Sequence, residues 1–111
     1  MAILHAQPGE IISVRPLGEQ LPSSQTTALI KTAQFEVIRL VLPAGKVIPE
    51  HRTAGEITVQ CLEGKVNFTT SGVVKLLTAG DLIYLSAKEP HAVEALEQTS
   101  LLVTIMFPKT E

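Results

Sequence analysis

GKVIPEH at residues 45–51 and GDLIYLSAKEPH at residues 80–91 are the two stretches that decide the fold. Each begins with a glycine and ends with a histidine that follows a proline by one or two residues. The chain around them has the pattern of short strands separated by turns. We expect the two stretches to form two sides of one pocket. Two histidines brought together inside a small β-barrel can hold a divalent metal.

Length and composition limit the classes of protein to which the chain can belong. The 111 residues are 45% apolar, enough for one hydrophobic core, and we expect one domain over 1–111. Within it we expect an N-terminal strand segment at 1–15 and a barrel from about 28 to 107. The net charge of −2 without a basic cluster predicts no nucleic-acid partner.

The expected cellular setting is the cytoplasm. No apolar stretch reaches the roughly 20 residues that cross a bilayer, so no membrane partner is expected. The N-terminus shows no signal-peptide pattern, and the single cysteine, Cys61, excludes an internal disulfide. We interpret Cys61 as a buried thiol that packs as a small apolar residue.

The pattern after residue 28 predicts an all-β fold. Apolar runs recur every 8–12 residues with glycine or proline between them, and no window keeps a helical period. The polar stretch 16–27 is predicted to be a loop. The predicted strands cover residues 28–30, 35–42, 57–62, 66–70, 73–77, 82–85, 91–96 and 101–107.

The first stretch resembles one of the two sequence motifs of the cupin superfamily, G-x(5)-H-x-H-x(3,4)-E-x(6)-G. Gly45 and His51 match its opening, and Gly64 matches its close. Thr53 stands where the motif has its second histidine. Glu56 lies one residue before the glutamate position counted back from the closing glycine.

The second stretch resembles the other cupin motif, G-x(5)-P-x-G-x(2)-H-x(3)-N. Gly80 and His91 keep its spacing. Ser86 replaces the proline, Lys88 the second glycine and Ala95 the asparagine. The resemblance covers residues 43 to 106, and the spacing matches better than the residue types.

The resemblance implies a double-stranded β-helix, or jelly-roll barrel, with the two motifs on neighbouring strands around a central pocket. It also implies a homodimer, because cupins are often dimers. The superfamily includes dioxygenases, isomerases, decarboxylases, storage proteins and sensors, so the fold leaves the activity open.

The resemblance places His51 and His91 at positions that supply two of four metal ligands in metal-binding cupins. Glu56 and Gln60 are candidate third ligands, and the metal would be iron, manganese, zinc, nickel or copper. The alternative is a pair of hydrogen-bonded pocket histidines without metal. Glu56 and Gln60 share one face of their predicted strand, and the opposite face carries apolar residues. The strand register decides which face lines the pocket.

Three polar residues are candidate substrate contacts: Thr53, Gln60 and Tyr84. Two functional hypotheses follow. In the first, a small apolar or carboxylated molecule binds in the barrel of a metal-dependent enzyme of the oxygenase or isomerase type. In the second, the barrel is a metal-free binding or sensing module with an apolar pocket. A third interpretation, an assembly unit without a ligand, explains the polar motif loops least well.

Overall fold

The structure is a computed structural model that describes residues 5–108, and it is all-β as the sequence predicts. One 3-10 helix, η1 (Gly18–Ser23), lies within the predicted loop. No helix among the described residues is long and apolar enough to cross a membrane. The strands are β1 (Thr27–Lys31), β2 (Phe35–Leu42), β3 (Val47–His51), β4 (Ile57–Glu63), β5 (Lys65–Thr70), β6 (Val73–Thr78), β7 (Leu82–Leu85), β8 (His91–Ala95) and β9 (Thr99–Met106).

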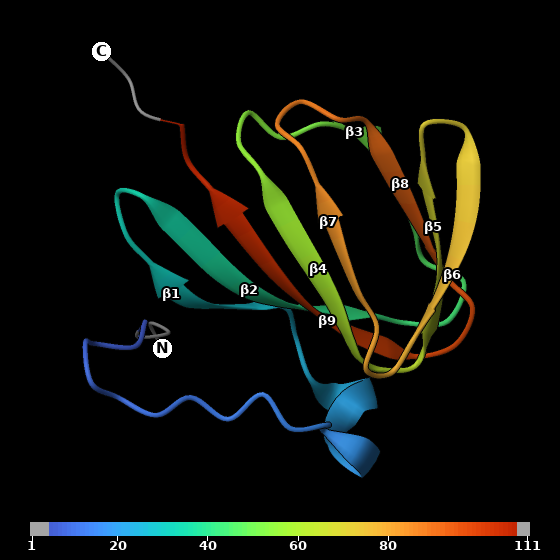
Figure 1. Cartoon of the computed structure of the whole chain (residues 1–111). Helices are drawn as coiled ribbons and strands as arrows, with labels where there is room; N and C mark the ends of the chain where they lie inside the picture. Colours follow the sequence, from blue (N-terminus) through green and yellow to red (C-terminus); the bar gives the residue numbers. More distant parts are fainter. Residues whose placement is uncertain (1–4, 109–111) are drawn as a thin grey trace.

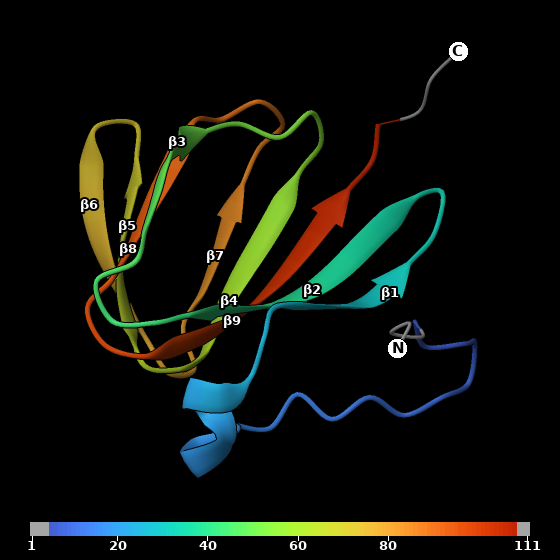
Figure 2. The same ribbon diagram turned by 180° about the vertical axis from the view of Figure 1, so that it is seen from behind.

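The strands form two antiparallel sheets that face each other (Figures 1 and 2). The five-stranded sheet has the order β1-β2-β9-β4-β7, and the four-stranded sheet has the order β3-β8-β5-β6. This arrangement is the double-stranded β-helix that the resemblance implied. Strands β3 and β8, which carry the two motif histidines, are neighbours in the smaller sheet.

The core lies between the two sheets because alternate side chains of each strand point inward. On β4 the inward set is Ile57, Val59 and Cys61, each nearly or fully buried. Burial raises the pKa of the Cys61 thiol, in agreement with a packed, unreactive cysteine. The buried apolar cluster comprises Leu42, Ile57, Val59, Cys61, Val66, Phe68, Leu77, Leu85, Val93, Ala95 and Leu101.

The N-terminal segment differs from the prediction of a strand over 1–15. Residues 5–17 contain no strand, and residues 1–4 lie outside the described part of the chain. The buried Arg39 guanidinium donates hydrogen bonds to the carbonyl oxygens of Val14 and Arg15. The segment is therefore held against the five-stranded sheet by these side-chain bonds and by one backbone bond, from the Ala6 N–H to the Leu29 carbonyl oxygen (2.9 Å), without the ladder of backbone bonds that a strand would form.

Glu63 anchors the end of the same segment. Its carboxylate accepts hydrogen bonds from the Leu17 N–H (2.8 Å), the Gly18 N–H (3.1 Å) and the Ser100 hydroxyl (2.7 Å). It also lies 3.9 Å from the Arg39 guanidinium. Burial alone would raise the pKa of Glu63, but these hydrogen bonds and the arginine charge outweigh it and lower the pKa.

We expect Glu63→Gln to lower the free energy of unfolding at neutral pH by about 1–3 kcal/mol, because the amide cannot satisfy these donors as the carboxylate does. The folded-state pKa of Glu63 lies below its ordinary value of 4.5. Its stabilisation is therefore present above that value and is lost as pH falls through the folded pKa. Denaturant unfolding near pH 7 and near pH 3 measures both effects. Equal losses in Glu63→Gln and in the exposed control Glu94→Gln would contradict this role.

Candidate functional site

The two motif histidines meet at one point of the smaller sheet. His51, the last residue of β3, is the register partner of His91, the first residue of β8. Their ring centroids are 4.3 Å apart, and the ring planes are inclined at 61°. The structure therefore brings together the two residues that the sequence singled out first.

A register irregularity in β3 allows the first histidine to face inward. Ile48 and His51 are three positions apart, so strict alternation would place them on opposite faces of the sheet. The pairing with β8 shifts between these two residues, as in a β-bulge, and both side chains line the same cavity. A sequence reading by alternation alone does not reveal this irregularity.

Both imidazoles are oriented by a backbone carbonyl two residues earlier in the chain. His51 Nδ1 lies 3.1 Å from the Pro49 oxygen, and His91 Nδ1 lies 3.1 Å from the Glu89 oxygen. A carbonyl oxygen only accepts, so each Nδ1 carries the proton of the bond. In the neutral rings each Nε2 is then left with a free lone pair. Within residues 5–108 neither Nε2 makes a hydrogen bond.

His91 is the more rigid member of the pair. His91 is 4% exposed, and the Phe68 ring stacks on its imidazole with centroids 5.6 Å apart and planes within 7°. Burial lowers the pKa of His91; the hydrogen bond to the Glu89 carbonyl opposes this shift, and the neighbouring His51 adds to it. His91 is therefore neutral at physiological pH.

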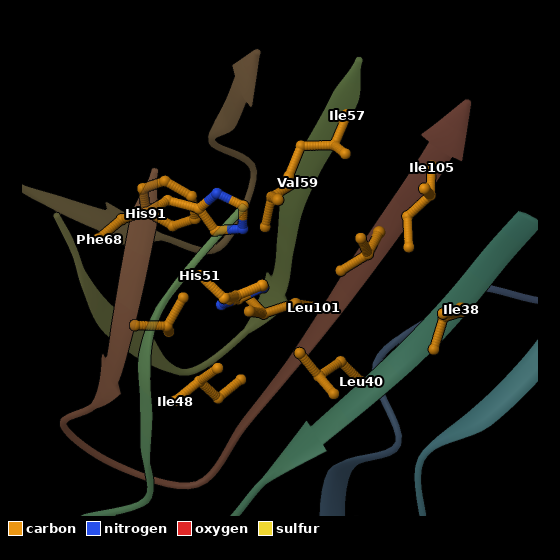
Figure 3. A pocket seen from close by; sticks show the side chains of 12 residues that line it. Ile38, Leu40, Ile48, His51, Ile57, Val59, Phe68, His91, Leu101 and Ile105 are labelled. Atoms are coloured by element: carbon orange, nitrogen blue, oxygen red, sulfur yellow. The ribbon is translucent and has the colours of Figure 1, made fainter. Parts of the chain in front are cut away.

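The histidines close one end of an apolar cavity between the two sheets (Figure 3). The cavity has a volume of about 210 Å³, and side chains from both sheets point into it. His51 is exposed while His91 is buried, so the first histidine lies nearer to solvent. The lining consists of Ile38, Leu40, Ile48, His51, Ile57, Val59, Phe68, His91, Val93, Leu101, Val103 and Ile105.

Three of the predicted site residues lie on the outer face of the larger sheet, away from the cavity. Glu56 and Gln60 alternate with the inward residues of β4, and neither lines the cavity. Tyr84 is 58% exposed on β7, and its hydroxyl donates a hydrogen bond to the Glu56 carboxylate. The structure therefore does not bring Glu56 or Gln60 into the cavity beside the two histidines, where the predicted third metal ligand would have to lie. Gln60 and Tyr84, the predicted substrate contacts, are also absent from the cavity lining.

Thr53 also takes no part in the cavity. Its hydroxyl donates to the Gly55 carbonyl oxygen at 3.0 Å and so closes the loop between β3 and β4. This bond gives Thr53 a structural role in the loop, and the predicted substrate contact is absent from the cavity lining. The carbonyl oxygen of Thr53 also accepts the Lys88 N–H, at 2.9 Å, which ties the two motif loops together.

The donor set does not fit the metal centre that the resemblance implies. The described residues contain no group of three or more His, Cys, Asp or Glu side chains placed to hold one ion. The two free Nε2 atoms are suitable donors, but protein metal centres of the expected kinds combine at least three protein ligands. The apolar side chains around the histidines offer no further oxygen, nitrogen or sulfur donor.

Glu89 is a site residue that the sequence reading missed. Its carboxylate accepts hydrogen bonds from the Ser86 N–H (3.2 Å) and hydroxyl (3.0 Å), and from the hydroxyls of Thr70 (3.1 Å) and Ser71 (3.3 Å). The bonds from Ser86 are the first cause of its lowered pKa. The loop that carries the carbonyl partner of His91 is thus fixed. The Ser-x-x-Glu spacing of a capping box was the available signal.

Comparison with known proteins agrees with this geometry. The family model described as "Cupin domain" matches residues 38–107, and no curated protein matches the sequence. A cupin superfamily protein from Desulfitobacterium hafniense superposes with a TM-score of 0.77 at 16% identity, covering 93% of this chain and 100% of that one.

Two further solved structures have the same fold. An RmlC-like cupin with a double-stranded β-helix fold, from Methanocaldococcus jannaschii, has a TM-score of 0.71 at 16% identity, covering 88% of this chain and 93% of its own. A predicted oxalate decarboxylase from Thermotoga maritima has a TM-score of 0.68 at 22% identity, and the match covers 75% of this chain and 79% of that one. These identities establish the fold alone. Together with the family match over most of its length, they show that the chain belongs to the cupin family.

Proposed function

We propose that the protein is a small-molecule binding module that takes up a compact, mainly apolar molecule without a metal ion. The observation that carries the proposal is the 210 Å³ cavity, in which ten of the twelve lining residues are Ile, Leu, Val or Phe. Ligand sites are typically apolar clefts with a few polar groups that orient the ligand. Here the two imidazoles at one end supply those groups.

The size of the cavity suits a single ring with small substituents. An apolar cavity of about 150 Å³ is large enough to bind benzene. The larger cavity of this protein accommodates such a ring together with one or two short substituents. Burial of the apolar surface of the ligand, at about 25 cal/mol per Å², provides the main favourable term.

A metal-dependent oxygenase or isomerase is less well supported by the donor chemistry. Such a centre requires a third protein ligand, and the expected one, Glu56, points away from the histidines and accepts a hydrogen bond from Tyr84. The predicted oxalate decarboxylase among the similar structures shares the fold with this chain. The fold alone does not carry its reaction over to this pocket.

The test is a binding experiment with metal-free protein. Protein purified without an affinity tag and treated with a chelator is titrated with toluene, and the methyl signals of isoleucine, leucine and valine are followed by NMR. We expect saturable shifts confined to the cavity residues Ile57, Val59, Leu101 and Val103. Binding that appears only after iron, manganese, zinc, nickel or copper is restored would contradict the proposal and support a metal centre.

We also propose that the protein is a homodimer. The outer face of the five-stranded sheet supports this, because Leu82 is 64% exposed on it and Tyr84 is 58% exposed. A second copy would cover these side chains. Light scattering at micromolar concentration is expected to give about twice the chain mass of 11.9 kDa. A mass of one chain under these conditions would contradict the dimer.

A further inference from the structure

The polar end of the cavity presents hydrogen-bond acceptors only. Nδ1 of His51 and Nδ1 of His91 are each committed to a backbone carbonyl at 3.1 Å, so both protons point away from a ligand. With the proton of each ring on Nδ1, the remaining Nε2 atom has a lone pair and no proton. A ligand that meets these atoms must therefore bring its own hydrogen-bond donor.

The Nε2 atom of the buried histidine has space beside it. Among the described residues that are not exposed, one side-chain nitrogen or oxygen atom is both inaccessible to solvent and without a hydrogen-bond partner, and that atom is Arg39 Nε. His91 Nε2 also has no hydrogen-bond partner, so it must be accessible to solvent or to a ligand. His91 also lines the cavity, and the Phe68 ring stacked on it fixes its orientation.

The remainder of the cavity offers nothing to a charged ligand. No lysine or arginine lines it, and its walls beyond the two histidines are hydrocarbon. A carboxylate in the cavity would lose its hydration without gaining a positively charged partner, and it would face the lone pairs of the two Nε2 atoms. An ammonium group would be desolvated in the same way, with no carboxylate in the lining to balance it.

We infer that the ligand is a compact neutral alcohol or phenol whose hydroxyl donates a hydrogen bond to Nε2 of His51 or His91. Its hydrocarbon part fills the space bounded by Ile57, Val59 and Leu101. The inference rests on the proposed function and adds the chemical class of the ligand to it. It also narrows the sequence-based expectation of an apolar or carboxylated molecule by removing the carboxylates.

The experiment compares ligands that differ at one group only. Two series are titrated into chelator-treated protein by calorimetry at about pH 8, above the ordinary pKa of an imidazole. One series is 4-ethylphenol, 4-ethylanisole and 4-ethylbenzoate; the other is cyclohexylmethanol, its methyl ether and cyclohexanecarboxylate. In each series we expect the hydroxyl compound to bind about tenfold more tightly than the ether, the gain of one well-placed hydrogen bond. The carboxylate is expected to bind most weakly.

Two single variants test whether the histidines cause this preference. His51→Leu and His91→Leu each replace one acceptor by an apolar side chain of similar size. We expect the ethers still to bind both variants. In at least one variant, the affinity ratio of the hydroxyl compound to its ether is expected to fall to about twofold or less. A preference unchanged in both variants would overturn the assignment of the acceptor atoms.

The outcomes separate this inference from the proposed function. If ethers bind as tightly as hydroxyl compounds, or carboxylates bind most tightly, the inference is overturned and the binding function stands. If no compound of either series binds at millimolar concentration, both are overturned. Tighter binding of the hydroxyl compounds in both series, together with its loss in a histidine variant, supports the inference.

Discussion

Gly64→Ala is expected to lower the free energy of unfolding by about 2–5 kcal/mol. Gly64 forms the turn between β4 and β5 with a φ of +92°, where a residue with a Cβ is strained. An added Cβ would overlap Thr99 Oγ1 and the Gln98 carbonyl oxygen, and it would lie 2.7 Å from Thr99 Cα. Thr99 is fully buried and bonded to Lys65, so it has little room to move.

Gly72→Ala is the matched control for this clash. Gly72 has a φ of +72°, and an added Cβ would meet no atom within 4 Å. This variant carries the backbone strain alone, about 1–2 kcal/mol. Chemical denaturation followed by circular dichroism gives both losses. A loss in Gly64→Ala no larger than the loss in Gly72→Ala would contradict the close packing of the Gly64 turn against β9.

Val103→Phe is expected to weaken ligand binding at least about tenfold, or 1.4 kcal/mol, while the protein stays folded. Val103 lies in the middle of β9, opposite Val59 on β4 and Ile38 on β2, and all three side chains line the cavity. A phenyl ring at this position occupies space that the ligand needs. Filling a cavity that is already open costs less than overpacking a dense core.

Val37→Phe makes the same substitution on the other face of the same sheet. Val37 is the β2 partner of Thr104 and is absent from the cavity lining. Calorimetric titration of both variants with 4-ethylphenol, after circular dichroism has shown them folded, gives the comparison. Unchanged affinity in Val103→Phe, or equal losses in the two variants, would place the binding site outside the barrel.

Much of the fold could be predicted because its physical signal is local. The runs at 35–42 and 82–85 correspond residue for residue to β2 and β7, since apolar strands bounded by glycine and proline are a strong pattern. Strand β3 was not predicted as a strand because it contains Pro49, and in the structure none of its residues is buried. It lies at an edge of its sheet, where proline is tolerated, and it pairs with β8 alone.

The site could be predicted only in part, for reasons of register. The spacing of glycine and histidine identified His51 and His91, whose meeting depends on topology shared across the family. The side that Glu56 takes depends on whether the preceding loop shifts the register by one residue. The structure leaves Ile57 inward and Glu56 outward, so the carboxylate is lost from the pocket.

The N-terminal segment illustrates a different limit. Its apolar run at 10–15 has a strand-like pattern, but in the structure the end of the run is held by Arg39 and the residues just after it by Glu63, both of which lie 24 or more residues further along the chain. Neither residue carries a local signal of that role. Bonds from distant side chains to a segment's backbone are set by tertiary packing, and strand propensity alone does not predict them.

The most direct test of the metal-free pocket is a crystal of chelator-treated protein soaked with 4-bromophenol. Anomalous scattering locates the bromine, and the electron density locates the hydroxyl oxygen. The account predicts bromine in the cavity between the two sheets and the oxygen within hydrogen-bond distance of Nε2 of His51 or His91. Bromine outside the barrel, or an anomalous peak of a retained metal between the two imidazoles, would contradict it.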